Sequence, residues 1–194
     1  QVLVADLNLE GALEVATSVG PAARALRVDV SVAADVRTMM EAAELHFGRL
    51  DILVNNAGIG HLPQPLEALP EEQFDRLFAV NMKAIYLAMR EAVPRFKAAN
   101  NGQGRGVVLN MASTAGVSPR PRLAWYNASK GWVITATRAS AVELAPFGIR
   151  VNALNPVAGE TPLLATFMGE DTPAMRAKFL STIPIGRFST PEDL

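Results

Sequence analysis

Short apolar runs alternate along the chain with longer segments in which apolar residues recur at helical spacing. The runs are rich in β-branched residues and end in polar or turn residues, as buried parallel strands do. The longer segments suit the crossover helices that join such strands. This pattern predicts an α/β fold. The predicted strands are Val2–Ala5, Ala25–Val30, Ile52–Asn55, Gly106–Met111 and Ile149–Asn155.

The longest periodic segment runs from Glu71 to Ala98 and predicts a long helix. Leu9–Val19 and Trp125–Pro146 predict two further helices. Ser31 is expected to cap another helix, whose apolar face includes Met39 and Phe47.

With 194 residues, 49% of them hydrophobic, the chain can bury one core, and we expect a single domain over residues 1–194. The net charge of −1 and the scattered basic residues give no electrostatic footprint for nucleic acid or an anionic membrane. The absence of cysteine excludes disulfides and thiolate sites. His46 and His61 lack metal-ligand spacing, so no metal site is expected. No apolar run reaches the ~18 residues of a membrane-spanning helix.

Two residues of the third predicted helix suggest acid/base chemistry. Tyr126 and Lys130 lie just over one helical turn apart and project from the same face. A neighbouring ammonium is expected to lower the tyrosine pKa from its ordinary value of ~10, which suits a general acid/base. Ser113 follows an apolar strand and is expected to reach the same cleft. A Tyr/Lys pair at this spacing also arises by chance, so the neighbouring sequence must decide whether the pair forms a catalytic site.

A second signature, Asp51–Gly58 (DILVNNAG), precedes Ser113 by about fifty residues. With the run Tyr126–Lys130 (YNASK), it makes essentially the whole chain similar to the short-chain dehydrogenase/reductase family. The resemblance implies a Rossmann-type, doubly wound parallel sheet. It also implies that a serine polarises the substrate oxygen, a tyrosine passes the proton, a lysine binds the nicotinamide ribose and a helical asparagine completes a proton relay. The matching residues are Ser113, Tyr126, Lys130 and Asn81.

Asn81 lies within the long predicted helix, where an amide is ordinarily solvated or locally hydrogen-bonded. The segment Asn81-Met82-Lys83-Ala84 resembles the family's active-site segment, in which a backbone kink holds a water beside the lysine. The resemblance also implies a homo-oligomer, a dimer or tetramer, formed through the helices of Asn81 and Tyr126.

Asp6 ends the first predicted strand, where a carboxylate can bind the adenosine ribose and repel a 2′-phosphate. No Arg or Lys occurs before Arg24, so NAD is favoured over NADP; the alternative is that Asp6 only forms a turn. Asp29 and Val30 resemble the pair that frames the adenine ring, and the alternative for them is a strand end with a cap.

Two further segments resemble cofactor contacts of the family. Asn55, Ala57 and Gly58 belong to a stretch of small residues that lets the backbone approach the ribose. Pro156, Gly159 and Thr161 belong to the segment that holds the nicotinamide carboxamide, although the family often has glycine where Val157 stands.

The family's first strand and its Gly-rich pyrophosphate loop have no counterpart in the sequence. Gly102, Gly104 and Gly106 precede a strand instead of following one, so they are interpreted as a loop. We therefore expect a longer parent protein, with that strand between those ending at Asp6 and Asn55 and a last helix and strand beyond Leu194.

Residues 163–183 are rich in apolar side chains and occupy the position of the family's mobile lid, which indicates a largely apolar pocket. Lid side chains can pack on their own protein or on substrate, and both alternatives stay open. Arg120 and Arg122 could contact an anionic acyl carrier or coenzyme A thioester, but a solvated loop is favoured.

The resemblance implies a cytoplasmic, NAD(H)-dependent oxidoreductase that interconverts a small-molecule secondary alcohol and a ketone. Members similar to 3-oxoacyl carrier-protein reductase and glucose 1-dehydrogenase match best overall. One alternative is an NADP(H)-dependent 3-oxoacyl thioester reductase. Another is a non-catalytic dinucleotide-binding or scaffold protein of the same fold, in which Tyr126 and Lys130 would be free to change. A receiver-like phosphoacceptor domain fits poorly, because Asp6 and Asp29 alone do not form its acidic cluster.

Overall fold

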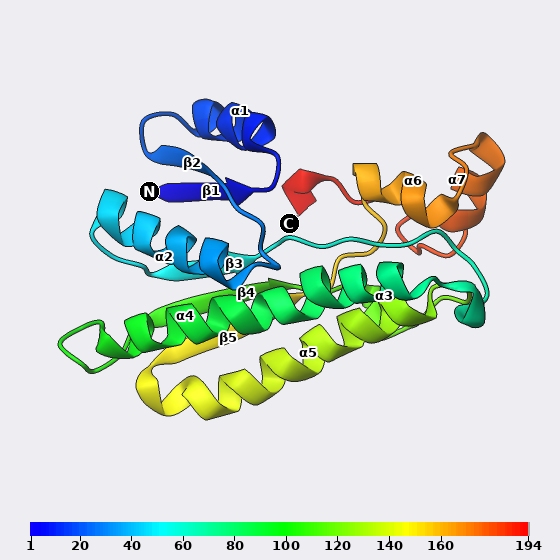
Figure 1. The fold of residues 1–194 in the computed structure, drawn as a ribbon. Coiled ribbons are helices and arrows are strands. Elements are labelled where there is room, and N and C mark those ends of the chain that lie inside the picture. Colours follow the sequence, from blue (N-terminus) through cyan, green and yellow to red (C-terminus); the bar gives the residue numbers. More distant parts are fainter. Residues whose placement is uncertain (194) are drawn as a thin grey trace.

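The computed structural model describes residues 1–193 and has an α/β fold, as the sequence predicts (Figure 1). All paired strands are parallel. They form a two-stranded sheet, β1-β2, and a three-stranded sheet, β3-β4-β5. The strands are β1 (Val2–Asp6), β2 (Ala23–Arg27), β3 (Ile52–Asn55), β4 (Gly106–Met111) and β5 (Ile149–Leu154).

The helices α2, α4 and α5 lie on one side of the sheets, and α1 lies on the other side against β1 and β2. Figure 1 shows α6 and α7 beyond the carboxyl ends of the strands. The α-helices are α1 (Leu9–Val19), α2 (Ala33–Phe47), α3 (Glu71–Phe78), α4 (Ala84–Ala98), α5 (Ala124–Leu144), α6 (Pro162–Met168) and α7 (Pro173–Leu180). Short 3-10 turns occupy Leu66–Ala68, Thr114–Gly116, Ala145–Phe147 and Pro191–Asp193.

The main core lies between the three-stranded sheet and the helices α2, α4 and α5. Apolar side chains from all six elements meet there on one face of the sheet, whereas Ile52 and Val54 of β3, which point to the opposite face, are 60% and 51% exposed. The central members are Val36, Met40, Leu53, Leu87, Ala92, Phe96, Val108, Leu144, Ile149 and Val151. The strand register places Asn55 opposite Asn110 and Met111 opposite Leu154, so polar residues that follow these strands emerge at one edge.

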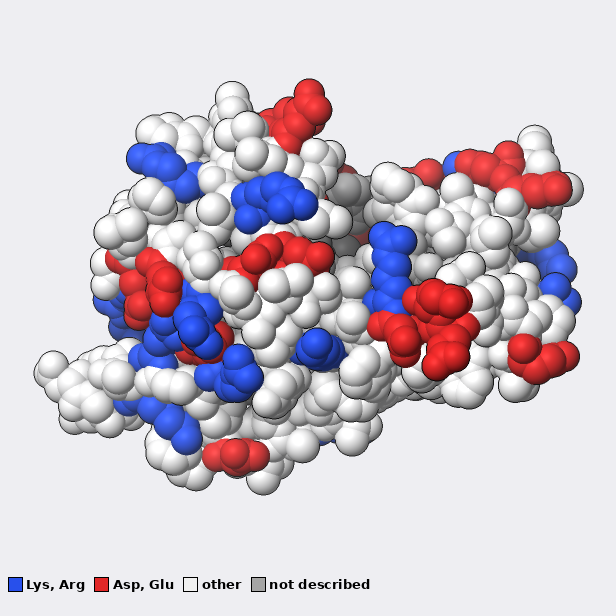
Figure 2. All heavy atoms as spheres, viewed as in Figure 1, with Lys and Arg blue, Asp and Glu red and all other residues white. Residues whose placement is uncertain are grey.

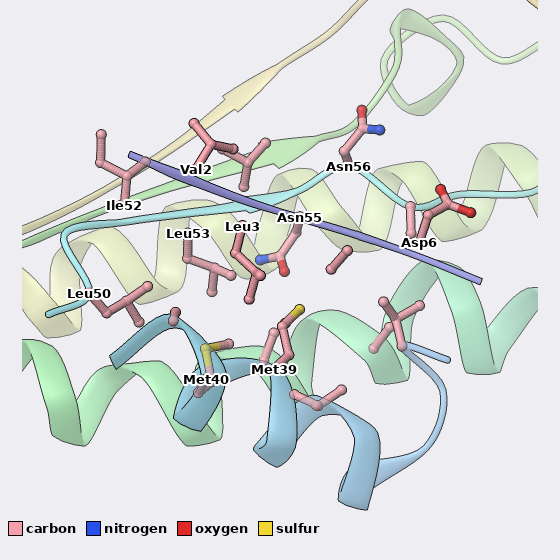
Figure 3. A pocket seen from close by; sticks show the side chains of 18 of the residues that line it. Val2, Leu3, Asp6, Met39, Met40, Leu50, Ile52, Leu53, Asn55 and Asn56 are labelled. Atoms are coloured by element: carbon pink, nitrogen blue, oxygen red, sulfur yellow. The ribbon is translucent and has the colours of Figure 1, made fainter. Parts of the chain in front are cut away.

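A groove separates the two sheets, because β1 and β3 face each other without pairing. Its cavity measures about 630 Å³. Figure 3 shows Val2 and Leu3 of β1 and Leu53 of β3 along its walls, with Met39 and Met40 of α2 below them. The groove lies where the resemblance places the family's first strand.

Two local predictions were wrong. The second strand ends at Arg27, so Asp29 and Val30 lie in the connection to α2 and not in a strand. Ser31 does not cap α2, whose N-cap residue is Val32. The reason is local competition: the Ser31 hydroxyl and backbone N–H both donate to Asp29 Oδ1, at 2.6 and 2.9 Å.

The long predicted helix is interrupted where the sequence predicts a kink. A π-helical turn at Ala79–Lys83 joins α3 to α4 and contains Asn81. Such single turns bend a helix by inserting one extra residue and often mark functional sites.

The surface carries both signs of charge. Figure 2 shows acidic and basic side chains interspersed on the face in view, in keeping with the net charge of −1. Within residues 1–193, no helix combines the length and apolar character needed to cross a membrane.

The close approach of Gly116 to the backbone of α5 leads to a prediction about stability. A Cβ at Gly116 would lie 2.6 Å from the Lys130 carbonyl carbon and 2.7 Å from Gly131 N, both backbone atoms of α5. Gly116→Ala should therefore displace this helix and cost about 1–3 kcal/mol of unfolding free energy in urea titrations. Gly131→Ala is the matched control across the same contact. Its Cβ would meet Gly116 O at an ordinary 3.6 Å, so it should be neutral or stabilising by up to about 1 kcal/mol. Equal losses in the two variants would contradict the close approach.

Candidate active site

The carboxyl ends of β4 and β5 position the first polar group of the site. Ser113 follows β4 after one buried alanine, and its hydroxyl accepts from Ala115 N at 3.1 Å and lies 3.4 Å from Pro156 O, to which it donates. Pro156 O also accepts from Thr114 N at 3.1 Å. The serine hydroxyl is thus held between the segments that leave the two strands.

Helix α5 brings Tyr126 and Lys130 to the same place. Their exposed fractions are only 5% and 6%. The ammonium of Lys130 donates to Met111 O at 2.7 Å and lies 5.9 Å from the centre of the Tyr126 ring. The Tyr126 phenol interacts with the Ser113 hydroxyl. The structure therefore brings together Ser113, Tyr126 and Lys130 as the sequence predicts.

The predicted effect of Lys130 on the tyrosine is wrong in this structure. Burial raises the pKa of Tyr126 above its ordinary value, and only the contact with Ser113 counteracts the rise. Burial also lowers the pKa of Lys130 to about 8. Both shifts have one cause, which is that a poorly solvated site disfavours the charged form of each group.

Asn81 is the most buried polar residue of the site, with 1% of its surface exposed. Its Oδ1 accepts from Ile59 N at 2.9 Å, and its Nδ2 donates to Ile59 O at 2.9 Å and to Ser129 Oγ at 3.1 Å. The side chain thus joins the π-helical turn, the loop after β3 and helix α5. Its role in a proton relay stays a prediction.

The loop after β3 passes close to the lysine. A Cβ at Gly58 would lie 3.4 Å from Lys130 Nζ and 3.6 Å from Asn81 Oδ1, so the loop backbone lies against the site at Ala57 and Gly58, both of which are exposed. The Asn55 side chain does not join the groups around Lys130. Its Nδ2 donates to Asn110 Oδ1 at 2.8 Å, which gives its side chain a structural bond between neighbouring strands.

The predicted adenosine contacts meet at the groove. Asp6, Val30, Asn55 and Ala57 all line it, and Figure 3 shows Asp6 at one end of β1. Asp6 is exposed, and its Oδ1 accepts from Asn8 N at 2.8 Å, so the turn alternative describes part of its role. Asp29 is not among the lining residues. Hydrogen bonds from Ser31 lower the pKa of Asp29 and hold its carboxylate in place.

The predicted nicotinamide segment leaves β5 and leads into the lid. Gly159 forms a parallel bridge with Ser189, and a Cβ there would lie 3.0 Å from Ser189 Oγ. Thr161 is the N-cap residue of α6 and is exposed, and within residues 1–193 its hydroxyl forms no side-chain hydrogen bond.

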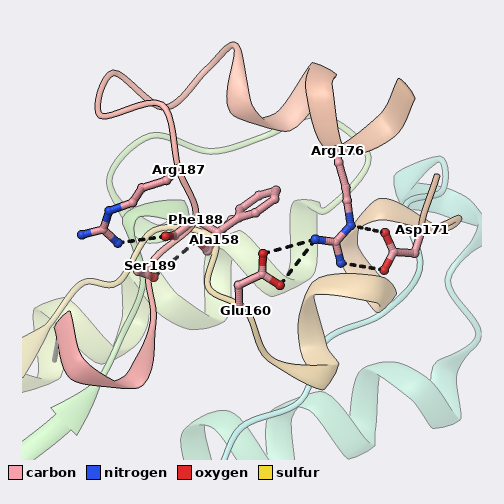
Figure 4. A network of polar contacts seen from close by, with 7 residues as sticks. All are labelled: Ala158, Glu160, Asp171, Arg176, Arg187, Phe188 and Ser189. Atoms are coloured by element: carbon pink, nitrogen blue, oxygen red, sulfur yellow. Dashed lines mark hydrogen bonds and ion pairs between the residues drawn. The ribbon is translucent and has the colours of Figure 1, made fainter. Parts of the chain in front are cut away.

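The predicted lid, residues 163–183, forms a small core together with Phe188 and contacts Tyr126. The Phe167 ring lies 4.6 Å from the Tyr126 ring, centre to centre. Gly60 makes room for it, because a Cβ there would lie within 2.5 Å of the Phe167 ring. Figure 4 shows how charge fixes the segment: Arg176 pairs with Glu160 and Asp171, and Arg187 lies beside Phe188 and Ser189.

Sequence reasoning missed two polar pairs that support the site. Ser129 lies inside the Tyr126–Lys130 run and binds Asn81. Asn110 donates to Thr137 Oγ1 at 2.9 Å. A single amide inside an apolar strand was the available signal for Asn110. For Ser129, the sequence offered no feature that would indicate its bond to Asn81, apart from the small size of its side chain.

Three comparisons describe what the chain is similar to. A protein-family model described as enoyl-(acyl carrier protein) reductase matches residues 1–194. The 4-formylbenzenesulfonate dehydrogenase of Comamonas testosteroni is 49% identical over 100% of this chain and 77% of its own length. Galactitol 2-dehydrogenase of Agrobacterium fabrum is 35% identical over 100% of the chain and 77% of its own length. Among solved structures, a 3-ketoacyl-(acyl-carrier-protein) reductase from Brucella melitensis complexed with NADH superposes with a TM-score of 0.92 at 51% identity, over 99% of this chain and 76% of that one.

Burial of Lys130 predicts an unusual dependence of stability on pH. The lysine is charged up to a pKa of ~10.5 in the unfolded chain but only up to about 8 in the folded one. Unfolding between these values takes up a proton, so stability should rise with pH across this window. Above ~10 the raised Tyr126 pKa reverses the trend, because the unfolded tyrosine ionises first.

Lys130→Met removes the buried charge. It should be about 2–3 kcal/mol more stable than the parent at pH 7, after loss of the hydrogen bond to Met111, and should lose most of the rise from pH 8 to 10. Urea unfolding at several pH values measures this, with the exposed Lys178→Met as control. Parallel pH profiles for parent and Lys130→Met would contradict the buried charge.

Proposed function

The chain belongs to the short-chain dehydrogenase/reductase family and is an oxidoreductase acting on CH–OH groups, and from this premise we propose that it interconverts a secondary alcohol and a ketone with NAD(H). The observation that carries the proposal is the meeting of a buried phenol, a serine hydroxyl and a buried lysine at the carboxyl edge of the sheet.

The residues present suit both ends of an NAD(H) molecule, the adenosine end and the nicotinamide end. On the adenosine side, the exposed carboxylate of Asp6 stands at the groove, where it would accept from ribose hydroxyls and repel a 2′-phosphate. On the nicotinamide side, the Lys130 ammonium and the free hydroxyl of Thr161 would bind ribose and carboxamide. The solved structure at 51% identity is named as a complex with NADH. No Gly-rich pyrophosphate loop occurs in the sequence.

Reduction needs a hydride at the carbonyl carbon and a proton at its oxygen, and bound NADH supplies the hydride. Tyr126 donates the proton, and its raised pKa keeps it protonated at neutral pH. Ser113 hydrogen-bonds the reacting oxygen and stabilises the charge that develops on it. Lys130, adjacent and partly deprotonated near its pKa of about 8, lies on the path by which Tyr126 regains a proton. Phe167 excludes water from this side of the ring.

Two helices of the chain suit an interface between subunits. We infer a cytoplasmic homo-oligomer through α4 and α5. Val142 on α5 is 79% exposed, a large apolar side chain that such an interface would cover.

A 3-oxoacyl thioester is the second candidate substrate. It is supported by the structural neighbour from Brucella melitensis, which is named a 3-ketoacyl-(acyl-carrier-protein) reductase. The same residues would reduce its ketone, so the two candidates differ only in what the rest of the pocket binds.

Tyr126→Phe tests the proposed proton donor. It removes only the hydroxyl, so turnover should fall by about 10²–10⁴-fold, while NADH binding, measured by fluorescence titration, stays within a factor of about two. The control is Tyr86→Phe at the second tyrosine, which is 55% exposed and should keep full activity. Turnover retained in Tyr126→Phe would exclude this mechanism.

A further inference from the structure

Arg120 lies between the start of the catalytic helix and the lid, and it is not the solvated residue that the sequence favours. Its side chain is partly buried. One guanidinium nitrogen donates to Thr182 Oγ1 at 3.2 Å, and the guanidinium stacks over the Phe179 ring at 4.5 Å. Its backbone carbonyl accepts from Asn127 Nδ2 at 2.7 Å, which ties it to the residue next to Tyr126.

The charge of Arg120 is not neutralised by the protein. Arg176 of the lid and Arg187 just after it each pair with carboxylates, whereas no ion pair in residues 1–193 involves Arg120. Burial lowers the pKa of Arg120 below its ordinary value, and carboxylates raise the pKa of the other two. A guanidinium has five N–H donors and stays charged at neutral pH. Most of the donors of Arg120 are therefore available to a ligand.

Two aromatic contacts join the lid to residues of the body. Phe167 lies on Tyr126, where the proton is transferred, and Phe179 lies on Arg120. We propose, resting on the function above, that Arg120 is a specificity-determining residue that binds an anionic group of the substrate. The substrate is then a small carbonyl compound with its ketone at Tyr126 and a carboxylate or sulfonate at Arg120.

The geometry favours a small organic anion over a carrier-bound acyl chain. Two oxygens of a carboxylate or sulfonate match the guanidinium fork and accept two parallel charge-assisted bonds. The contacts of Arg120 with Thr182 and Phe179 use one of its N–H donors and one face of its guanidinium, so the remaining donors can bind a compact anion. The neighbouring Arg122 is exposed and would suit the phosphates of a carrier protein or coenzyme better than the partly buried Arg120 does.

Paired ketones test the assignment. 4-Acetylbenzoate and 4-acetylbenzamide share a ring and a ketone and differ in the charge of one similarly shaped group. The parent chain should prefer the anion by at least about tenfold in kcat/KM. Arg120→Gln should abolish this preference by reducing kcat/KM for the anion only, and Arg120→Lys should retain part of it. Arg122→Gln, a change at the exposed neighbour, should keep the full preference.

A purely structural role for Arg120, as a clamp on the lid, predicts something different. Loss of the clamp would reduce kcat/KM for both ketones alike, and that result would overturn the proposal. Acetoacetyl-CoA distinguishes the source of the anion. If Arg120→Gln impairs reduction of this thioester but not of 4-acetylbenzoate, the small-anion assignment is wrong.

Binding separates this proposal from the proposed reaction. Calorimetric titration of the two ketones into the chain, with and without NADH, should show tighter binding of 4-acetylbenzoate by at least about tenfold, lost in Arg120→Gln. Selective binding without reduction would refute the reaction and leave the anion site standing. Reduction of both ketones with equal binding would refute the anion site alone. If the two ketones bind equally well, or if neither binds, the anion site is overturned.

Discussion

The site depends on one buried amide. Asn81 is 1% exposed and uses both ends of its side chain, accepting from Ile59 N and donating to Ile59 O and Ser129 Oγ. An unsatisfied amide at this depth would be costly, so the three bonds hold together or fail together. They fix the loop that carries Gly58, the π-helical turn and helix α5 in one arrangement. Helix α5 in turn carries Lys130 to the edge of the sheet, where its ammonium donates to Met111 O.

Burial, and not mutual attraction, sets the electrostatics of the centre. Tyr126 and Lys130 share a poorly solvated space, so each tends toward its neutral form. The protein sustains this cost because neighbouring groups satisfy the polar atoms: Met111 O accepts from Lys130, and the Ser113 hydroxyl interacts with the phenol. Phe167 completes the enclosure from the lid. A bound substrate oxygen would take a place that these same groups already favour for a hydrogen bond.

Periodicity predicted the elements well, since β3, β4 and α1 have the predicted bounds. The spacing of Tyr126 and Lys130 predicted their shared face because a helix repeats locally. Three features could not be predicted from periodicity: two depend on tertiary contacts and one on a local competition between hydrogen bonds. Burial by Phe167 and its neighbours, absent from any local pattern, raised the Tyr126 pKa. Asp29 took the Ser31 hydroxyl that the sequence assigned to a helix cap. Half-burial of Arg120 required the distant Phe179.

The central claim is direct hydride transfer to a carbonyl carbon at this site. The most direct measurement is reduction of 4-acetylbenzoate with NADH deuterated at C4 of the nicotinamide, followed by mass spectrometry and NMR of the alcohol. The account predicts one deuterium on the carbinol carbon from one face of the labelled nicotinamide, with the hydroxyl proton drawn from solvent. An alcohol without deuterium at that carbon, or no alcohol from the ketone although it binds, would contradict it.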